Sequence, residues 1–240
     1  MVDVFGLRRR VERLDWAAIG QSLDQHGCAI TPPLLSASQC AQLIALYPQR
    51  ELFRKKVEMA RMRFGVGEYK YFADPMPPIV RELRAASYPR AAAIANRWIR
   101  ALDAAADPLP LDLDAYLRYC AQHGQTKPTP LMLRYEAGGY NCMHQDIYGR
   151  VIFPLQITVA LSRRGMDYSG GEFLLLEDRP RAQARGAAIA LERGEAVIFP
   201  SSFRPIAGAR GLYRARMRHG VSPLRSGVRY TLGIIFHNAE

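Results

Sequence analysis

Cysteine is scarce in this 240-residue chain. The four cysteines, Cys28, Cys40, Cys120 and Cys142, form no C-x-x-C pair and no zinc-binding spacing. This pattern excludes a disulfide-rich scaffold and a zinc module, and it favours free thiols in a reducing compartment. Cys142 lies two residues before His144, and we expect it to fill the protein interior rather than to bind a metal.

Long apolar runs are absent. No stretch approaches the roughly 20 apolar residues that a membrane-spanning helix needs. The first ten residues also lack the charged and then apolar order of a signal peptide. With 49% hydrophobic and 23% charged residues, the composition is typical of a globular protein in water. We therefore expect a cytoplasmic protein without a membrane partner.

Acidic residues are few in comparison with basic ones. The chain has 33 basic and 22 acidic residues, which gives a formal net charge of +11. Only four of the basic residues are lysine. Between Ala196 and Ala239 there are seven arginines and no aspartate or glutamate. A surface of this sign attracts polyanions, and their binding then depends on salt.

The two parts of the chain show different periodicities. Helical patterns cover residues 15–26, 36–47 and 79–105, with Ser36 or Ser38 as the N-cap of the second, and a short helix capped by Asp112 or Asp114 extends to Cys120. After a Gly, Thr and Pro-rich stretch at 124–130, the chain has short β-rich runs: Leu131–Glu136, Val151–Leu161, Glu172–Glu177, Ala187–Leu191, Ala196–Pro200, Tyr213–Gly220 and Val228–His237. Short strands at this spacing predict a closed or double-sheet structure. We expect one domain over residues 1–240, with residues 1–125 mainly helical and residues 130–240 forming the β core.

Histidine is rare, with five in the chain. His144 and Asp146 are two residues apart, so a β-strand would direct both side chains to one face. Together with His219 from another strand, they would form the facial triad of non-haem Fe(II) oxygenases, which leaves three coordination positions open. The H-x-D pair alone is weak evidence, so the prediction depends on neighbouring residues. We expect His237, in the last strand, to make a core or substrate-side hydrogen bond.

Arg229 follows His219 by ten residues. An arginine suits the far carboxylate of a dicarboxylate, because its planar guanidinium makes paired, charge-assisted hydrogen bonds. Thr231 shares the same strand face and can add a hydroxyl. Tyr135, nine residues before His144, can add a phenol from the preceding strand.

These residues, with the motifs around them, resemble the 2-oxoglutarate/Fe(II)-dependent dioxygenases. The match covers roughly residues 130 to 237 and rests on His144-x-Asp146, on Ser169–Phe173 (SGGEF), on Gly194–Pro200 (GEAVIFP) and on the interval from His219 to Arg229. The resemblance implies an α+β fold, a double-stranded β-helix (jelly roll) with N-terminal helices buttressing one sheet. It also implies Fe(II), 2-oxoglutarate and O2 as cofactors, with His144, Asp146 and His219 as metal ligands.

A narrower resemblance concerns the substrate. Met132–His144 and the C-terminal strands are similar to a bacterial oxygenase family thought to act on damaged nucleic acid, distantly related to AlkB-type demethylases. Two features depart from the AlkB pattern. Leu133 occupies the position of a usual asparagine, and the ten-residue interval before Arg229 is more typical of prolyl-type hydroxylases. A protein hydroxylase therefore stays an alternative.

The segment Phe53–Phe72 interleaves basic and aromatic residues. Aromatic rings stack on bases while cations contact phosphates, so this composition suits a nucleotide-binding lid. The alternative is a solvated basic helix followed by a β-hairpin whose aromatics pack inward. If the segment is a lid, the expected substrate contacts are Arg61, Arg63, Phe64, Tyr69, Lys70 and Tyr71.

The sequence thus predicts a dioxygenase that oxidatively dealkylates nucleic acid, with alkylated DNA favoured, and a monomer. Two hypotheses stay open beside it. One is a prolyl-type protein hydroxylase with the same iron site. The other is a basic nucleic-acid-binding protein without enzymatic activity, which intact ligands and an intact Arg229 argue against.

Overall fold

The computed structural model describes residues 4–208 and 211–240. Its five α-helices are α1 (Val4–Glu12), α2 (Trp16–His26), α3 (Ala37–Leu46), α4 (Pro78–Leu102) and α5 (Leu113–Gln122), and two short 3-10 helices are η1 (Arg50–Leu52) and η2 (Met59–Met62). The N-caps of α3 and α5 are among the residues that the sequence analysis predicted. Ser36 and Gln39 form a reciprocal capping box at α3, and Asp112 accepts a hydrogen bond from the first turn of α5.

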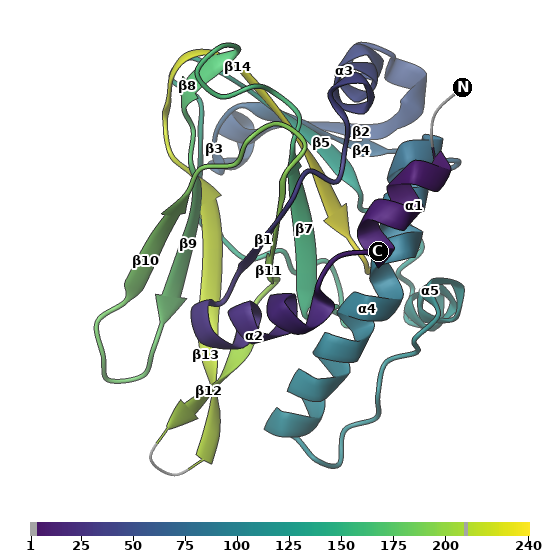
Figure 1. Ribbon diagram of the computed structural model, residues 1–240, viewed down its shortest axis with the longest axis vertical. Coiled ribbons are helices and arrows are strands. Elements are labelled where there is room, and N and C mark those ends of the chain that lie inside the picture. Colours follow the sequence, from purple (N-terminus) through teal and green to yellow (C-terminus); the bar gives the residue numbers. More distant parts are fainter. Residues whose placement is uncertain (1–3, 209–210) are drawn as a thin grey trace.

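The strands form two sheets (Figure 1), and every pairing between named strands in the described part of the chain is antiparallel. The eight-stranded sheet contains, in spatial order, β1 (Ala29–Thr31), β11 (Ala196–Pro200), β7 (Leu155–Ala160), β14 (Leu224–Ile235), β5 (Leu131–Glu136), β4 (Glu68–Phe72) and β2 (Phe53–Glu58), and β8 (Tyr168–Gly170) also pairs with β14. The six-stranded sheet contains β10 (Arg185–Ile189), β9 (Phe173–Asp178), β13 (Gly211–Val221), β6 (Tyr140–His144) and β3 (Gly65–Val66), and β12 (Phe203–Gly208) also pairs with β13.

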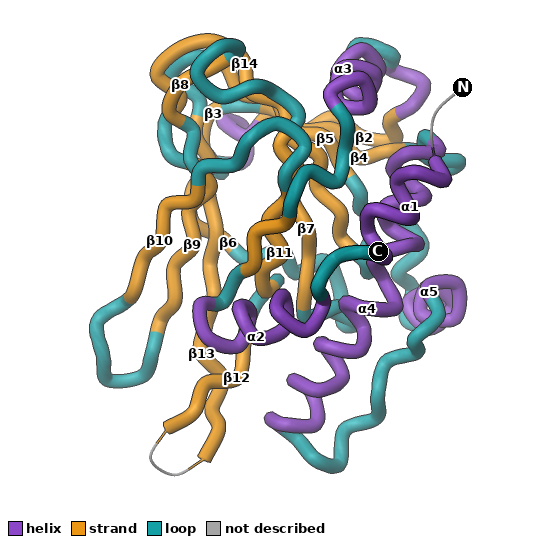
Figure 2. Tube along the Cα trace, in the orientation of Figure 1, coloured by secondary structure: helices purple, strands orange, loops and turns teal. Residues whose placement is uncertain are grey.

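Side-chain alternation separates the core from the interior between the sheets. On β7, Leu155, Ile157 and Val159 pack into one large cluster with residues of all five helices. The intervening Gln156 and Thr158 line a cavity on the opposite face. The helices therefore cover the outer face of the large sheet, as Figures 1 and 2 show for α1, α4 and α5. Polar groups are consequently directed toward the space between the sheets.

The structure confirms most of the predicted helices and β-rich runs and adds others. Two predicted strands, Leu131–Glu136 and Ala196–Pro200, have the same bounds as β5 and β11. Helix α1 and strand β12 were not expected, and the strand expected at His144 and Asp146 is β6, which ends at His144. The segment Phe53–Phe72 contains β2, η2, β3 and β4, and β4 pairs with β5 within the large sheet. Tyr71 and Phe72 pack inward, as in the hairpin alternative, but the basic part of the segment is strand rather than helix. Among the described residues, no helix is both long and apolar enough to cross a membrane.

Candidate active site

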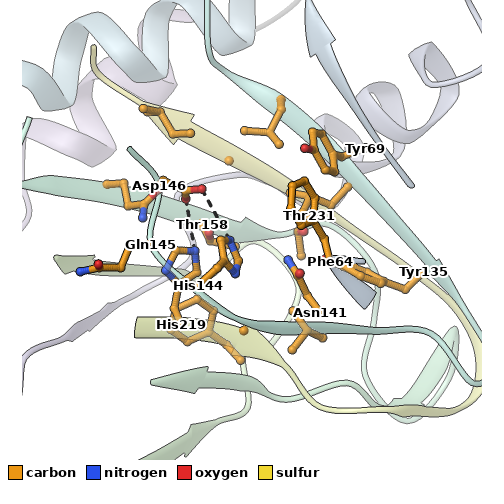
Figure 3. A pocket seen from close by; sticks show the side chains of 18 of the residues that line it. Phe64, Tyr69, Tyr135, Asn141, His144, Gln145, Asp146, Thr158, His219 and Thr231 are labelled. Carbon is orange, nitrogen blue, oxygen red and sulfur yellow. Dashed lines mark ion pairs between the residues drawn. The ribbon is translucent and has the colours of Figure 1, made fainter. Parts of the chain in front are cut away.

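A cavity of about 270 Å³ lies between the two sheets. Its walls come from β4, β5, β7 and β14 of the large sheet and from β6, β9 and β13 of the small sheet, with the turn before β3 and the loop after β6. Figure 3 shows His144, Asp146 and His219 grouped on one side of this cavity, with Phe64, Tyr69 and Tyr135 on another. The cavity thus joins residues that are far apart in the sequence.

The three predicted ligands converge. His144 and His219 are register partners on neighbouring strands β6 and β13, and their ring centroids are 4.2 Å apart. One donor atom from each of His144, Asp146 and His219 can be chosen so that all lie within 4.8 Å of one another. Asp146 does not lie on the strand, as the alternation argument assumed, because β6 ends at His144 and Asp146 is in the following loop. The predicted convergence of the three side chains is confirmed, but Asp146 reaches the two histidines from a loop and not through strand alternation.

A hydrogen bond to one ring nitrogen of His144 leaves the other nitrogen available to a metal. Its Nδ1 lies 2.8 Å from the Cys142 carbonyl oxygen. Because a carbonyl can only accept, Nδ1 carries the proton and the Nε2 lone pair stays available to a metal. Burial opposes the charged form of His144, but the adjacent Asp146 outweighs this and raises the pKa of the imidazole.

Asp146 is the buried anion of the group, with 8% of its surface exposed. Its Oδ2 lies 3.2 Å from His219 Nε2 and its Oδ1 lies 3.5 Å from His144 Nε2. Burial alone would raise the pKa of Asp146, yet the two histidines lower it well below its ordinary value. Tyr148 donates a 2.6 Å hydrogen bond to Asp146 Oδ1. The site therefore holds a charged carboxylate beside two imidazoles, which is a donor set suited to Fe(II).

The predicted co-substrate residues line the same cavity. Arg229 and Thr231 lie on β14, and Arg229 pairs in register with Tyr135 on β5. Arg229 is 3% exposed, and its guanidinium lies 5.7 Å from the Tyr135 ring centroid and 5.9 Å from that of Tyr168. Its Nε and Nη1 atoms have no hydrogen-bond partner among the described residues. Since a buried, unpaired guanidinium is costly, these free donors fit an anionic ligand such as the far carboxylate of 2-oxoglutarate.

The sequence analysis missed several polar cavity residues, among them Gln156, Thr158 and Tyr148. Gln156 and Thr158 lie on β7, and Tyr148 follows Asp146. The Gln156 side-chain nitrogen is buried without a partner in the described part of the chain. Two polar residues at alternating positions of an otherwise apolar run were the available signal for Gln156 and Thr158. The only signal for Tyr148 was its position two residues after a ligand.

The predicted substrate residues divide into different environments. Phe64 and Tyr69 line the cavity, whereas Tyr71 is buried beside Tyr69, with ring centroids 5.4 Å apart. Lys70 projects to the other face of β4, where its Nζ donates to the Tyr47 carbonyl at 2.7 Å.

Two further predicted contacts, Arg61 and Arg63, are exposed and lie outside the cavity wall. Arg61 forms a 2.6 Å ion pair with Glu58. Arg63 has a positive φ of 58° where η2 ends. The structure thus brings only Phe64 and Tyr69 of the predicted set to the cavity.

Two other expectations concern Cys142 and His237. Cys142 is exposed rather than interior, because the short β6 presents it to solvent, and this expectation was wrong. His237 is fully buried in the core, and its Nδ1 accepts a 3.2 Å hydrogen bond from the Phe153 amide. His237 thus makes a core hydrogen bond.

The arginines after Ala196 do not form one free cationic surface. Arg204 is buried against Glu177, Arg218 pairs with Asp178 at 2.9 Å, and Arg229 faces the cavity. Acidic residues of β9, outside the acid-free stretch, therefore neutralise part of it.

Comparisons with known proteins agree with this site. Residues 67–239 match the Oxygenase-NA family, described as an oxygenase catalysing oxidative methylation of damaged DNA. Uncharacterised proteins from two strains of Mycobacterium tuberculosis, CDC 1551/Oshkosh and H37Rv, are each 45% identical over 168 residues, which is 70% of this chain and 72% of theirs.

Solved structures share the fold. A prolyl-4-hydroxylase from Pseudomonas putida superposes with a TM-score of 0.58 at 15% identity, covering 94% of this chain and 99% of that one. A 2OG-Fe(II) family oxidoreductase from Burkholderia pseudomallei gives 0.54 at 14% identity, with 95% and 93% covered. A Trichoplax adhaerens prolyl hydroxylase, solved with a hypoxia inducible factor peptide, gives 0.56 at 13% identity, with 99% and 94% covered. The chain belongs to the Oxygenase-NA family and is an oxygenase, and its His-Asp-His cluster is consistent with the use of Fe(II), 2-oxoglutarate and O2.

Proposed function

We propose that this protein oxidatively dealkylates damaged nucleic acid, with alkylated DNA as its substrate. The observation that carries the proposal is the pairing of two features in one cavity. His144, Asp146 and His219 offer a metal site, and Arg229 offers unpaired, buried donors to a dicarboxylate. The match to a family described by its action on damaged DNA supports the choice of substrate.

Each residue then has a distinct role. His144, Asp146 and His219 would hold Fe(II), and Tyr148 orients the Asp146 carboxylate through its 2.6 Å hydrogen bond. Arg229 would bind the far carboxylate of 2-oxoglutarate, with Thr231 and Tyr135 beside it. When bound together, Fe(II), 2-oxoglutarate and O2 supply the oxidation, in which one oxygen atom enters a substrate C–H bond and the other enters succinate as CO2 is lost.

The chemistry removes an alkyl group rather than adding one. Oxygen inserted into an N-methyl C–H bond gives an N-hydroxymethyl group. The N–C bond then breaks, the hydroxyl proton passes to the base nitrogen, and formaldehyde leaves. The target base must be outside the helical stack, because the cavity admits it only when it is unpaired.

Four further proposals concern the whole molecule. The two sheets form a double-stranded β-helix that encloses the iron site. Residues 1–240 form one domain, because all five helices and the large sheet share one apolar core. The protein is a monomer. The cytoplasm is its compartment, where four free cysteines are stable.

A prolyl-type hydroxylase is the second candidate, favoured by the ten-residue interval between His219 and Arg229. One assay separates the two. Fe(II)-loaded protein is supplied with 2-oxoglutarate and either an N-methylated single-stranded oligonucleotide or a proline-containing peptide, and succinate and formaldehyde are measured. We expect the methylated oligonucleotide to give both products in equal amounts.

His144→Ala is the matched control, and it should fold but produce neither compound. Succinate formation that responds to the peptide and ignores methylated DNA and RNA would reject nucleic acid as the substrate. Undiminished turnover by His144→Ala would reject the metal site.

A further inference from the structure

A second groove, of about 640 Å³, opens beside the cavity along β2 and β4. It shares Phe64, Tyr69 and Tyr148 with the cavity wall, so the two spaces meet at these side chains. Five cationic residues line the groove, namely Arg54, Lys55, Lys56, Arg61 and Lys127, together with two acidic residues, Glu58 and Glu240. The groove therefore combines an excess of cationic side chains with direct access to the proposed iron site.

Three of these cations already have partners. Lys56 pairs with Glu68 at 2.5 Å and Arg61 with Glu58 at 2.6 Å. Arg54 donates to the Pro128 carbonyl at 2.8 Å and lies 4.6 Å from the Tyr71 ring centroid. Their charges are thus largely engaged within the protein.

Lys55 and Lys127 differ from them. Both are exposed, and neither side chain has an ion pair or hydrogen bond within residues 4–208 and 211–240. The register separates Lys55 from Lys56: after a bulge in β2, Lys55 pairs with Tyr71, whereas Lys56 pairs with Lys70 and forms its ion pair with Glu68. These two ammonium groups are free to contact an anionic ligand.

An aromatic side chain stands at the junction of groove and cavity. Phe64 is 43% exposed although it is large and apolar. Its backbone is fixed on both sides, because its amide donates to Met59 and its carbonyl accepts from Cys142 at 2.8 Å. Phe64 and Tyr69 both line the cavity and the groove, and Figure 3 labels both in the cavity wall. A rigid, exposed ring at the entrance to a cavity suits stacking against a planar base.

We propose that this groove binds the backbone of single-stranded DNA, with phosphates at Lys55 and Lys127, while Phe64 and Tyr69 stack on the base that enters the cavity. This inference rests on the proposed function for the identity of the base. It assigns the phosphate contacts to Lys55 and Lys127 instead of Lys70, whose ammonium is 4.2 Å from the Tyr47 ring on the far face of β4. A single strand fits because its bases need not be unpaired before one enters the cavity.

The test is binding of an unmodified single-stranded oligonucleotide, which requires no turnover. The variant Lys55→Gln/Lys127→Gln is compared with Arg90→Gln/Arg100→Gln, which removes the same charge from exposed positions of α4 on the outer face of the large sheet. Fluorescence polarisation is recorded over a salt series, with circular dichroism as the check of folding.

Two lost phosphate contacts should make the slope of log K against log salt shallower by about 1.4, because each contact with a single strand contributes about 0.7. If the two proteins bind alike near 1 M salt, the lysine variant should bind about 25-fold more weakly at 0.1 M salt. The α4 variant should bind as the unchanged protein does. Phe64→Ala should weaken binding without changing the salt slope.

Equal losses of DNA affinity in both double variants would mean that net charge alone attracts DNA. No loss of affinity in the lysine variant would mean that the DNA binds elsewhere on the protein. Either result would contradict the proposal that this groove binds DNA. An acidic peptide that competes as well as the oligonucleotide would overturn DNA as its ligand, and an RNA of the same sequence that binds more tightly would replace DNA by RNA. If DNA binding depends on the two lysines but no lesion is removed, the proposed function is rejected and the groove is supported. If lesions are removed but the lysine variant binds DNA as the unchanged protein does, the groove is rejected and the proposed function is supported.

Discussion

Replacing Arg229 by alanine should sharply weaken 2-oxoglutarate binding. Arg229 is 3% exposed, and two of its guanidinium nitrogens have no partner in the described residues. Removing one member of a buried, hydrogen-bonded charge pair costs about 2–5 kcal/mol. At 1.4 kcal/mol for each factor of ten, the dissociation constant should rise by about 30-fold to 4,000-fold.

The measurement is calorimetric titration of 2-oxoglutarate into Fe(II)-loaded protein without oxygen. Arg225→Ala is the matched control, since Arg225 lies on the same strand, carries the same charge and is exposed. A second measurement is thermal unfolding. Ligand at 100 times its dissociation constant should stabilise the unchanged protein by about 2.7 kcal/mol, and the same concentration should stabilise Arg229→Ala far less.

Arg229→Lys separates charge from shape. A lysine keeps the charge but cannot make the paired hydrogen bonds of a guanidinium, so we expect an affinity between those of the other two proteins. If Arg229→Ala and the unchanged protein titrate alike, then Arg229 is not the carboxylate partner. A loss in Arg225→Ala instead would assign that role to Arg225.

Three other predictions test the core and the cavity. Glu177→Gln should lower the free energy of unfolding by about 3–5 kcal/mol in chemical denaturation, because it leaves Arg204 buried without a charge partner. Asp178→Asn is the control: it removes a half-exposed ion pair and should lower the free energy of unfolding by less than about 1 kcal/mol. Burial lowers the pKa of His237 to about 4, so the folded state resists its protonation and stability should fall by about 3 kcal/mol as pH drops from 6.5 to 4. His237→Gln should lose this part of the pH dependence, and an unchanged pH profile would contradict the assignment. Metal-free protein should show no saturable binding of 2-oxoglutarate in the same titration, because Asp146 then repels the second carboxylate, and tight binding without metal would contradict this.

The sequence predicted the parts of the fold that depend on local periodicity. Strand β11 packs Ala196 and Ile198 toward the helices, strand β5 directs the apolar Leu131, Leu133 and Tyr135 to the cavity, and the predicted bounds of both strands match. Strand β6 has a mostly polar, partly exposed pattern and is held by pairing with β13, which lies about 75 residues away in the chain. No local pattern therefore predicts where this strand begins and ends.

The site was predictable in its residues but not in its geometry. Asp146 reaches the two histidines from a loop in which Tyr148 holds its carboxylate, and that contact depends on tertiary packing. In Phe53–Phe72, composition indicated cations and aromatics but not the faces on which they lie. The bulge between Phe53 and Lys55 changes the alternation, and pairing of β4 with β5 decides which side chains face the cavity.

The charges in the cavity explain why a metal should bind before the co-substrate. Asp146 places a negative charge at one end of the cavity, and Arg229 places a positive charge at the other. A dicarboxylate entering without metal would gain from Arg229 but would bring its second carboxylate toward Asp146 in a poorly solvated space, where like charges repel strongly. A divalent cation among His144, Asp146 and His219 changes the sum at that end from −1 to +1, because neutral imidazoles add no charge. Both ends then attract carboxylates, and only a ligand with two of them uses both.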